Sequence, residues 1–369
     1  MFTAGTTDGR VAAKVALAHK TAELVAGEAG ADCAFVSGSI TSGLGNETSD
    51  ADVFVVLTRG SASRASRQVV VGNDRVDIEY TTPDELERLV GQLLGLSIDR
   101  GNVTRYPSEA DLDTLVRLRY AQPTVSSPWL DAFRERLGRH DEVVRRLVIG
   151  RWSVLVNSEL EDLTGMLLSG DLDGARLVAR NAAVFAAKAV AAAAGDVYVG
   201  TKWVYSQLRR SAPADFPTAA FNDCVRGAWV GADPWRGAYT LWNLAQTCLA
   251  VAWTVGWHTT DISRWPTWIP GDIGLHRVPT LMPMRLMDSV VLNHELHRQL
   301  SVAPEMALVW SLCNGLPARE VVAAVQPLRT IAPEYASLDE ERCHDILAQL
   351  EQHRLVVTGE RPALELLTC

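Results

Sequence analysis

Residues 50–57, "DADVFVVL", set two acids at the start of an apolar run. The run is rich in valine and lies between polar, glycine-containing loops, so it predicts a short buried strand. Side chains two residues apart on a strand point to the same face, about 7 Å apart, which places Asp50 and Asp52 on one side. Neighbouring carboxylates repel each other unless a cation lies between them. The segment therefore predicts a sheet with a cation site where a buried strand begins.

A glycine–serine turn precedes this strand. Residues 31–39, "ADCAFVSGS", indicate another short buried strand that runs into Gly38 and Ser39. Backbone N–H groups and a hydroxyl after a strand can bind a phosphate, and Gly38 has no side chain to keep the phosphate away. We expect Gly43 to adopt a positive φ in the same loop. Phosphate donors are thus followed by metal ligands, as binding of a nucleoside triphosphate with magnesium requires.

A third acid comes from residues 75–80, "RVDIEY", where Asp77 and Glu79 share one face of a predicted strand. Magnesium prefers oxygen ligands, and usually only one or two carboxylates bind each ion. Asp50, Asp52 and Asp77 together therefore predict a site for two magnesium ions. Such a site suits in-line transfer at a phosphorus centre.

The neighbouring segments predict an α+β region. Amphipathic spacing predicts a helix over residues 10–28, and residues 67–82 predict two strands around a Gly-Asn-Asp turn. Thr82, Pro83 and Glu85 predict the start of a helix with a capping box.

The later segments predict helices. Residues 108–258 are rich in alanine and leucine and predict a helical bundle. Residues 263–283, crowded with proline and tryptophan, predict a linker or arm. After them, three helices followed by a strand are expected, which indicates a small winged-helix unit.

Composition excludes several classes of protein. The 369 residues fit two or three domains, and a net charge of −9 argues against nucleic-acid binding. The six cysteines are scattered, so we expect free thiols in a reducing cytoplasm. We expect no signal peptide, because "MFTAGTTDGRVAAK" lacks an apolar core, and a buried helix rather than a membrane span over residues 241–257. His294 and His297 have no further ligand nearby in the sequence.

The spacing GS-x3-G-x5-SD-x-D resembles the signature of the DNA polymerase beta-type nucleotidyltransferase superfamily. The matching residues are Gly38, Ser39, Gly43, Ser49, Asp50 and Asp52. "RVDIEY" resembles the third-acid strand of that superfamily and places the match on Asp77. The resemblance covers about residues 10–100 and implies a nucleotidyltransferase-fold mixed sheet with a two-magnesium site. An inactive member of the family and a coincidental acidic turn are the alternatives.

The helical region resembles the small-molecule branch, the kanamycin and related antibiotic nucleotidyltransferases. "GDVYVGTKWVYSQL" resembles a late helix of that branch and matches Lys202 to a lysine that meets the triphosphate; an exposed lysine beside a packed tryptophan is the alternative. The resemblance implies that a hydroxyl of the acceptor attacks the α-phosphorus and that pyrophosphate leaves. Glu79, Glu159 and Glu161 are candidate bases, although we favour solvated positions for all three.

Arg176, Arg180 and Lys188 share one face of an alanine-rich helix. Arg180 and its neighbours are candidate triphosphate ligands, and a solvated face is slightly favoured. Eight of the eleven tryptophans fall between residues 203 and 268, which we interpret as core packing rather than as an aromatic wall for the acceptor.

The C-terminal unit weakly resembles PqqD-like winged-helix domains, which bind leader peptides. The matching residues are Trp310, Asn314, Gly315, Glu320 and Leu350. A packing or dimerisation module is the alternative.

We therefore predict four segments: a catalytic domain over 1–107, a helical bundle over 108–262, a linker over 263–283 and a winged-helix domain over 284–369. The predicted enzyme is a cytoplasmic, magnesium-dependent nucleotidyltransferase. It would transfer AMP or another nucleoside monophosphate from a triphosphate to a hydroxyl of an antibiotic or natural-product intermediate. The alternatives are a peptide or protein acceptor recruited by the C-terminal domain, and a non-catalytic nucleotide-binding or interaction protein. The base of the nucleotide, the acceptor and the oligomeric state have no signal in the sequence.

Overall fold

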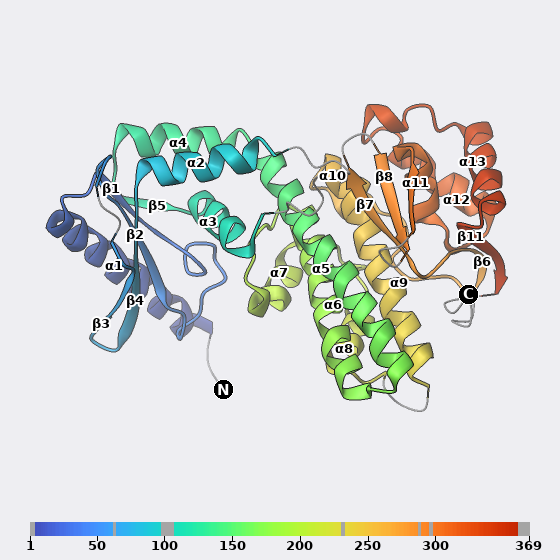
Figure 1. The fold of residues 1–369 in the computed structure, drawn as a ribbon, viewed down its shortest axis with the longest axis horizontal. Coiled ribbons are helices and arrows are strands. Elements are labelled where there is room, and N and C mark those ends of the chain that lie inside the picture. The colour runs from blue at the N-terminus through green and yellow to red at the C-terminus, as the bar shows by residue number, and fades with distance from the viewer. Residues whose placement is uncertain are drawn as a thin grey trace. The chain divides into compact units, whose positions relative to one another are not determined.

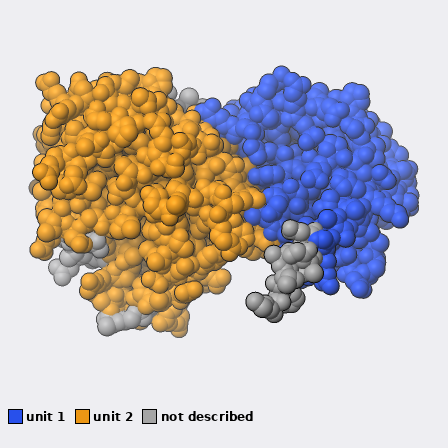
Figure 2. Space-filling model, turned by 180° about the vertical axis from the view of Figure 1, so that it is seen from behind, with its two compact units in different colours: residues 1–96, 107–144 blue, residues 97–106, 145–369 orange. Residues whose placement is uncertain are grey.

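The computed structural model describes residues 4–61, 64–96, 107–229, 233–286, 289–294 and 298–360. The chain is a mixed α+β protein that divides into two compact units (Figure 2). Unit 1 consists of residues 1–96 and 107–144, and unit 2 of residues 97–106 and 145–369. The domain boundaries at 107, 262 and 283 remain predictions.

Unit 1 holds a five-stranded mixed sheet (Figure 1). Its elements in chain order are α1 (Ala4–Ala29), β1 (Cys33–Ser37), β2 (Ala51–Val56), β3 (Arg67–Val71), β4 (Asp74–Thr81), α2 (Pro83–Leu94), α3 (Glu109–Arg119), β5 (Gln122–Val125) and α4 (Pro128–Gly138). The strand order is β3-β4-β2-β1-β5, in which β2 and β4 are parallel and the other neighbours are antiparallel. The strands expected within residues 31–39, 51–58 and 67–82 are confirmed; β5 was not expected.

Alternation of side chains along the strands gives this sheet two different faces. Ala34, Val36, Val53 and Val55 form one core cluster with buried alanines of α1. The opposite face carries Phe35 and Phe54, whose rings stack at 4.9 Å between centroids. Asp52 lies on this second face, because it is two residues before Phe54.

The start of α2 follows the predicted capping box. The Thr82 hydroxyl accepts from the Glu85 N–H, and the Glu85 carboxylate accepts from the Thr82 N–H. Pro83 occupies the first turn, where its missing N–H has no intrahelical partner in any case. The local sequence alone is therefore sufficient to start this helix.

Helix α5 (Asp141–Ser169) begins in unit 1 and continues in unit 2. The helices that follow in unit 2 are α6 (Leu172–Ala193), η2 (Thr201–Trp203), α7 (Val204–Ser211), α8 (Thr218–Arg226), α9 (Pro234–Trp253), α10 (Val255–His258) and η3 (Ile262–Arg264). Small side chains on α6 let other helices approach closely: a Cβ added at Gly256 would lie 2.4 Å from the Ala193 Cβ. Helix α9 is largely buried. In the part of the chain that the structure describes, no helix combines the length and the hydropathy that crossing a membrane needs.

The remainder of unit 2 adds two three-stranded sheets and further helices. Its elements are β6 (Ile273–Arg277), β7 (Leu281–Leu286), β8 (Ser289–His294), β9 (Arg298–Val302), α11 (Pro304–Leu312), β10 (Asn314–Leu316), α12 (Ala318–Val325), η4 (Gln326–Leu328), η5 (Pro333–Tyr335), α13 (Glu340–Gln352) and β11 (Val356–Glu360). The strand orders are β10-β6-β11 and β7-β8-β9. Residues 263–283, expected as a linker or arm, contain β6 and the start of β7.

The residues matched to PqqD-like domains are mostly core positions. Trp310 and Leu350 are fully buried, and the Trp310 indole N–H donates to the Leu355 carbonyl at 3.2 Å. Asn314 is buried and accepts from the Asn243 amide at 3.0 Å. Their burial explains the hydrophobic pattern by packing alone.

Candidate active site

Two of the predicted acids lie side by side on the sheet. Asp52 of β2 and Asp77 of β4 are direct partners in the parallel register, so their backbones are about 4.8 Å apart. Asp50 lies two residues before Asp52, just ahead of β2. Glu79 lies two residues after Asp77, on the same face of β4. The sheet therefore assembles acids that are 25 residues apart in the sequence.

A guanidinium from α3 binds this acidic face. Arg117 Nη1 lies 2.8 Å from Asp52 Oδ1 and 3.5 Å from Glu79 Oε1, and Arg117 Nε lies 2.5 Å from Asp113 Oδ2. The Ser37 hydroxyl donates to the Arg117 carbonyl at 2.5 Å, and Ser37 is the cross-strand partner of Asp52. Three carboxylates thus surround one cation, at the point where β1 meets β2.

Burial and these charges shift the pKa values. Burial raises the pKa of Asp52, and the neighbouring Arg117 guanidinium lowers it in part. Burial also raises the pKa of Glu79, and the Arg117 guanidinium again offsets part of the rise. Burial lowers the pKa of Arg117, but Asp52, Asp113 and Glu79 outweigh that effect and hold it above its ordinary value.

The other two predicted metal ligands, Asp50 and Asp77, also have partners. Asp50 Oδ1 lies 2.9 Å from Arg75 Nη2, and Asp77 Oδ1 accepts from the Gln68 amide at 2.7 Å. Across the residues described by the structure, no group of three or more His, Cys, Asp and Glu has a geometry that could hold a metal ion. The donor set suits magnesium chemically, because carboxylate oxygens are its preferred ligands. Binding with Asp50, Asp52 and Asp77 together would require Asp50 and Asp52 to exchange their arginine partners for the ion.

The glycine turn packs directly on the acidic face. Gly38 has φ +87°, and a Cβ added there would lie 1.8 Å from Asp52 Oδ2. Glycine is therefore required here for two reasons: the left-handed backbone and the adjacent carboxylate. Gly43 has φ +73°, as predicted. Its N–H donates to the Ile40 carbonyl, and the Leu44 and Gly45 N–H groups both donate to the Ser39 carbonyl.

The two serines of the predicted phosphate site are buried in this loop. The Ser49 hydroxyl accepts from the Asn46 N–H at 2.9 Å and donates to Asn46 Oδ1 at 3.2 Å. The Ser49 carbonyl accepts from the Lys14 ammonium at 2.8 Å. The Ser39 carbonyl accepts from the Leu44 and Gly45 N–H groups. These contacts fix the conformation of the loop.

The candidate residues of the helical region, Arg180, Lys188 and Lys202, lie in unit 2. Lys202 is exposed, with its ammonium 5.4 Å from the Trp203 ring centroid, and Arg180 is exposed on α6. Lys188, expected on the same face as Arg180, is instead buried. Its ammonium donates to the carbonyls of Tyr198 and Gly200 and to the Gln207 side chain, so it holds the segment after α6 in place.

The two candidate bases on α5 have different surroundings. Glu159 accepts from the Asn181 amide at 3.3 Å, and burial raises its pKa. Glu161 lines two adjoining pockets next to the β7–β9 sheet.

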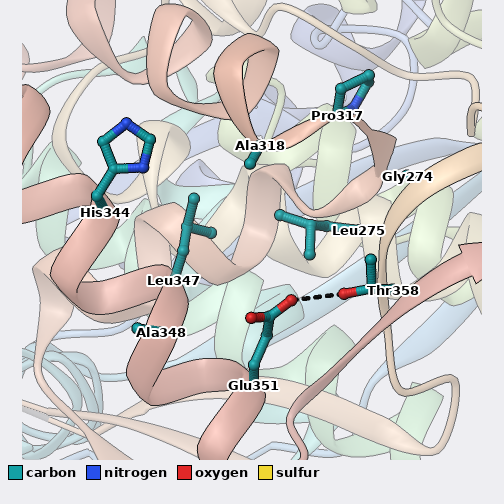
Figure 3. A pocket seen from close by; sticks show the side chains of 9 residues that line it. All are labelled: Gly274, Leu275, Pro317, Ala318, His344, Leu347, Ala348, Glu351 and Thr358. Carbon is teal, nitrogen blue, oxygen red and sulfur yellow. Dashed lines mark hydrogen bonds between the residues drawn. The ribbon is translucent and has the colours of Figure 1, made fainter.

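A groove of about 280 Å³ crosses the C-terminal part of unit 2 (Figure 3). One wall is α13, with His344, Leu347, Ala348 and Glu351, and the other is built from β6, β11 and the start of α12. The Thr358 hydroxyl donates to Glu351 at 2.5 Å across one end. The groove combines an apolar floor with polar ends.

Sequence reasoning missed the partners of the acids: Arg117, Arg75 and Gln68. Arg117 comes from a helix that begins after the predicted catalytic strands. Its only local signal is the acid four residues earlier, Asp113, an ordinary helix pair. Arg75 and Gln68 lie on the predicted strands, but their roles depend on strand pairing.

A scan against protein-family models finds no match, and a search of curated proteins finds no relative of this chain.

Proposed function

We propose that the protein is a magnesium-dependent nucleotidyltransferase whose acids lie on the sheet of unit 1. The observation that carries the proposal is the in-register pair Asp52–Asp77 beside Gly38. A carboxylate pair next to a turn with left-handed glycines favours a nucleoside triphosphate with its metal over a structural ion pair. The superfamily and its small-molecule branch are part of this proposal.

In this proposal Asp50, Asp52 and Asp77 would hold magnesium, and a bound ion would supply charge neutralisation of the triphosphate and a lower pKa for the attacking hydroxyl. The chain's own groups do the rest. The loop from Gly38 to Gly43 positions the phosphates, and Glu79, partly exposed beside Asp77, accepts the proton of the acceptor hydroxyl. The hydroxyl oxygen bonds to the α-phosphorus, and the bond from that phosphorus to the pyrophosphate oxygen breaks. Lys202 and Arg180 are candidate triphosphate ligands through the family resemblance alone.

The test is incubation of the full-length chain with each of the four labelled nucleoside triphosphates, magnesium and a cell extract. We expect a product heavier than its precursor by one nucleoside monophosphate, lost when magnesium is chelated. Asp52→Ala and Asp50→Ala should abolish turnover. Asp84→Ala, which changes an exposed acid paired with Arg59 in the same unit, should leave it unchanged.

Lys202→Ala should raise the KM for the triphosphate and leave the fold unchanged. An unchanged KM would remove Lys202 from the site. Triphosphate binding without any product, in extracts and with purified hydroxyl compounds, would favour the non-catalytic alternative.

A peptide acceptor is the second proposal, favoured by the groove along α13. An Ala348→Trp variant would fill this groove. If the acceptor is a peptide recruited there, the variant should lose transfer to it while keeping triphosphate binding. If the acceptor is a small molecule bound elsewhere, transfer should be unchanged.

A further inference from the structure

A second pocket lies within unit 2, between helix α5 and the β7–β9 sheet. We name it the helix–sheet pocket. It has a volume of about 260 Å³ and is lined on the helix by Val154, Asn157 and Glu161 and on the sheet by Met284, Val291 and Asn293, among others. This volume is close to the lower end of the range for small-molecule sites.

The sequence builds both walls by simple periodicity. Val154, Asn157 and Glu161 are spaced three and four residues apart, so they form one stripe of α5. On the sheet, Met284 pairs with Val291, and Asn293 follows two residues later on the same face. The odd-numbered residues of β7 point to the opposite face.

The polar lining consists of Asn157, Ser158, Glu161, Asn293 and Gln299, and one of its acceptors is unpaired. Within the described part of the chain, the buried Oδ1 of Asn293 has no hydrogen-bond partner. The Asn157 amide donates to the Ser153 carbonyl at 2.8 Å, which leaves its second N–H and its carbonyl oxygen for the pocket. Glu161 adds a carboxylate. A donor on a bound ligand would give Asn293 Oδ1 the partner that it lacks.

A small adjoining chamber repeats this pattern. It has about 20 Å³, is bordered again by Asn157 and Glu161, and includes Thr280. Thr280 is only 6% exposed, and among the described residues its hydroxyl has no hydrogen-bond partner. The chamber is large enough for a single water molecule. The unpartnered oxygens of Thr280 and Asn293 thus lie in adjoining cavities, where a bound donor would pair with them.

We propose that the helix–sheet pocket binds a small molecule with an apolar body and one hydroxyl or protonated amine that donates to Asn293 Oδ1. The valines and Met284 contact the apolar body. A carboxylate ligand is disfavoured, because it has no donor for Asn293 Oδ1 and would bring a negative charge to the pocket that Glu161 lines. This proposal does not rest on the proposed nucleotidyl transfer.

The test is binding of four matched probes to the full-length chain, followed by calorimetry and by saturation-transfer NMR. The probes are 3-phenylpropan-1-ol, its methyl ether, 3-phenylpropylamine and 3-phenylpropanoate. We expect the alcohol and the amine to bind, and the ether and the carboxylate to bind about tenfold more weakly, as loss of one hydrogen bond predicts. Failure of all four probes to bind, or equal affinity for the alcohol and its ether, would overturn the proposal.

Three variants locate the binding. Asn293→Leu should remove the preference for the alcohol over the ether, whereas a retained preference would exclude Asn293 as the acceptor. Val154→Trp should fill the pocket and abolish binding of all probes. Leu168→Trp, a matched change on the same helix at a residue that is 63% exposed, should leave binding unchanged. Circular dichroism and thermal unfolding establish that each variant is folded. Unaltered binding in a folded Val154→Trp protein would place the probes elsewhere and overturn the proposal.

Discussion

Replacing Gly38 by alanine should disturb the acidic site more than any other small change in its loop. The new Cβ would lie 1.8 Å from Asp52 Oδ2 and 2.8 Å from its Cγ, so the carboxylate has to move. It would then lose its 2.8 Å contact with Arg117. The backbone at φ +87° is also strained for any residue with a side chain.

The magnitude has two parts. The left-handed backbone costs an alanine about 1–2 kcal/mol. Loss of a charge-assisted hydrogen bond to a partly buried carboxylate costs roughly 1.5–3 kcal/mol. We therefore expect Gly38→Ala to lower the local free energy of opening by roughly 2.5–5 kcal/mol. Gly60→Ala is the matched control, because Gly60 has φ +76° with nothing within 4 Å of an added Cβ; it should cost about 1–2 kcal/mol.

Hydrogen exchange of peptides from β1 and β2, read by mass spectrometry, measures this free energy within unit 1. A double-mutant cycle isolates the clash: in an Asp52→Ala background, Gly38→Ala should cost only about 1–2 kcal/mol. If Gly38→Ala has the same cost in both backgrounds, the Asp52 carboxylate does not pack against the glycine, and the geometry given for the site is wrong.

Three other changes test the structure elsewhere. Glu334→Gln should lower stability at pH 7 by about 2 kcal/mol after allowance for solvent screening. Burial raises the pKa of Glu334, but hydrogen bonds from His258 and Arg285 outweigh burial and lower the pKa to about 2. The resulting stabilisation is complete above the ordinary pKa of 4.5 and is lost as the pH falls towards 2. In urea unfolding at pH 7, 4 and 3, the difference in stability between the unchanged protein and the variant should therefore shrink, and a constant difference would refute the assignment. Lys188→Met should cost about 3 kcal/mol by leaving buried acceptors without a donor, whereas a near-neutral effect in urea unfolding would show that the ammonium is dispensable. Thr82→Ala should cost about 1 kcal/mol through loss of the helix cap, read by hydrogen exchange in α2, with Thr58→Ala as an exposed control.

Much of unit 1 could be predicted because its signals are local. The valine-rich strands, the capping box at Thr82 and the left-handed glycine at position 43 each depend on a few adjacent residues. Strand β5 could not be predicted in this way. Its four residues include Pro123, and its only identifying feature is backbone pairing with β1.

The acids could be predicted from local sequence, whereas their partners depend on contacts between distant segments. Asp50, Asp52, Asp77 and Glu79 were found because strand alternation assigns each side chain to a face before any strand is paired. Arg117 was not found, because its position depends on how α3 packs after the sheet has formed. For Lys188 the local pattern was misleading. Helix spacing placed it on a basic stripe with Arg180, but the segment after α6 packs over it and buries it.

The acidic face carries more carboxylates than arginines that bind them. Asp52, Glu79 and Asp113 share the single guanidinium of Arg117, and Asp77, next to Asp52, accepts from the neutral amide of Gln68 on β3. One positive charge cannot neutralise this many carboxylates, so repulsion persists among them, and Asp77 and Asp113 both contribute to the raised pKa of Asp52. Added positive charge relieves that repulsion, and a divalent ion relieves more of it than a proton does. Arg117 then becomes a competitor for Asp52, and replacing it with methionine should tighten magnesium binding if the proposed site is correct.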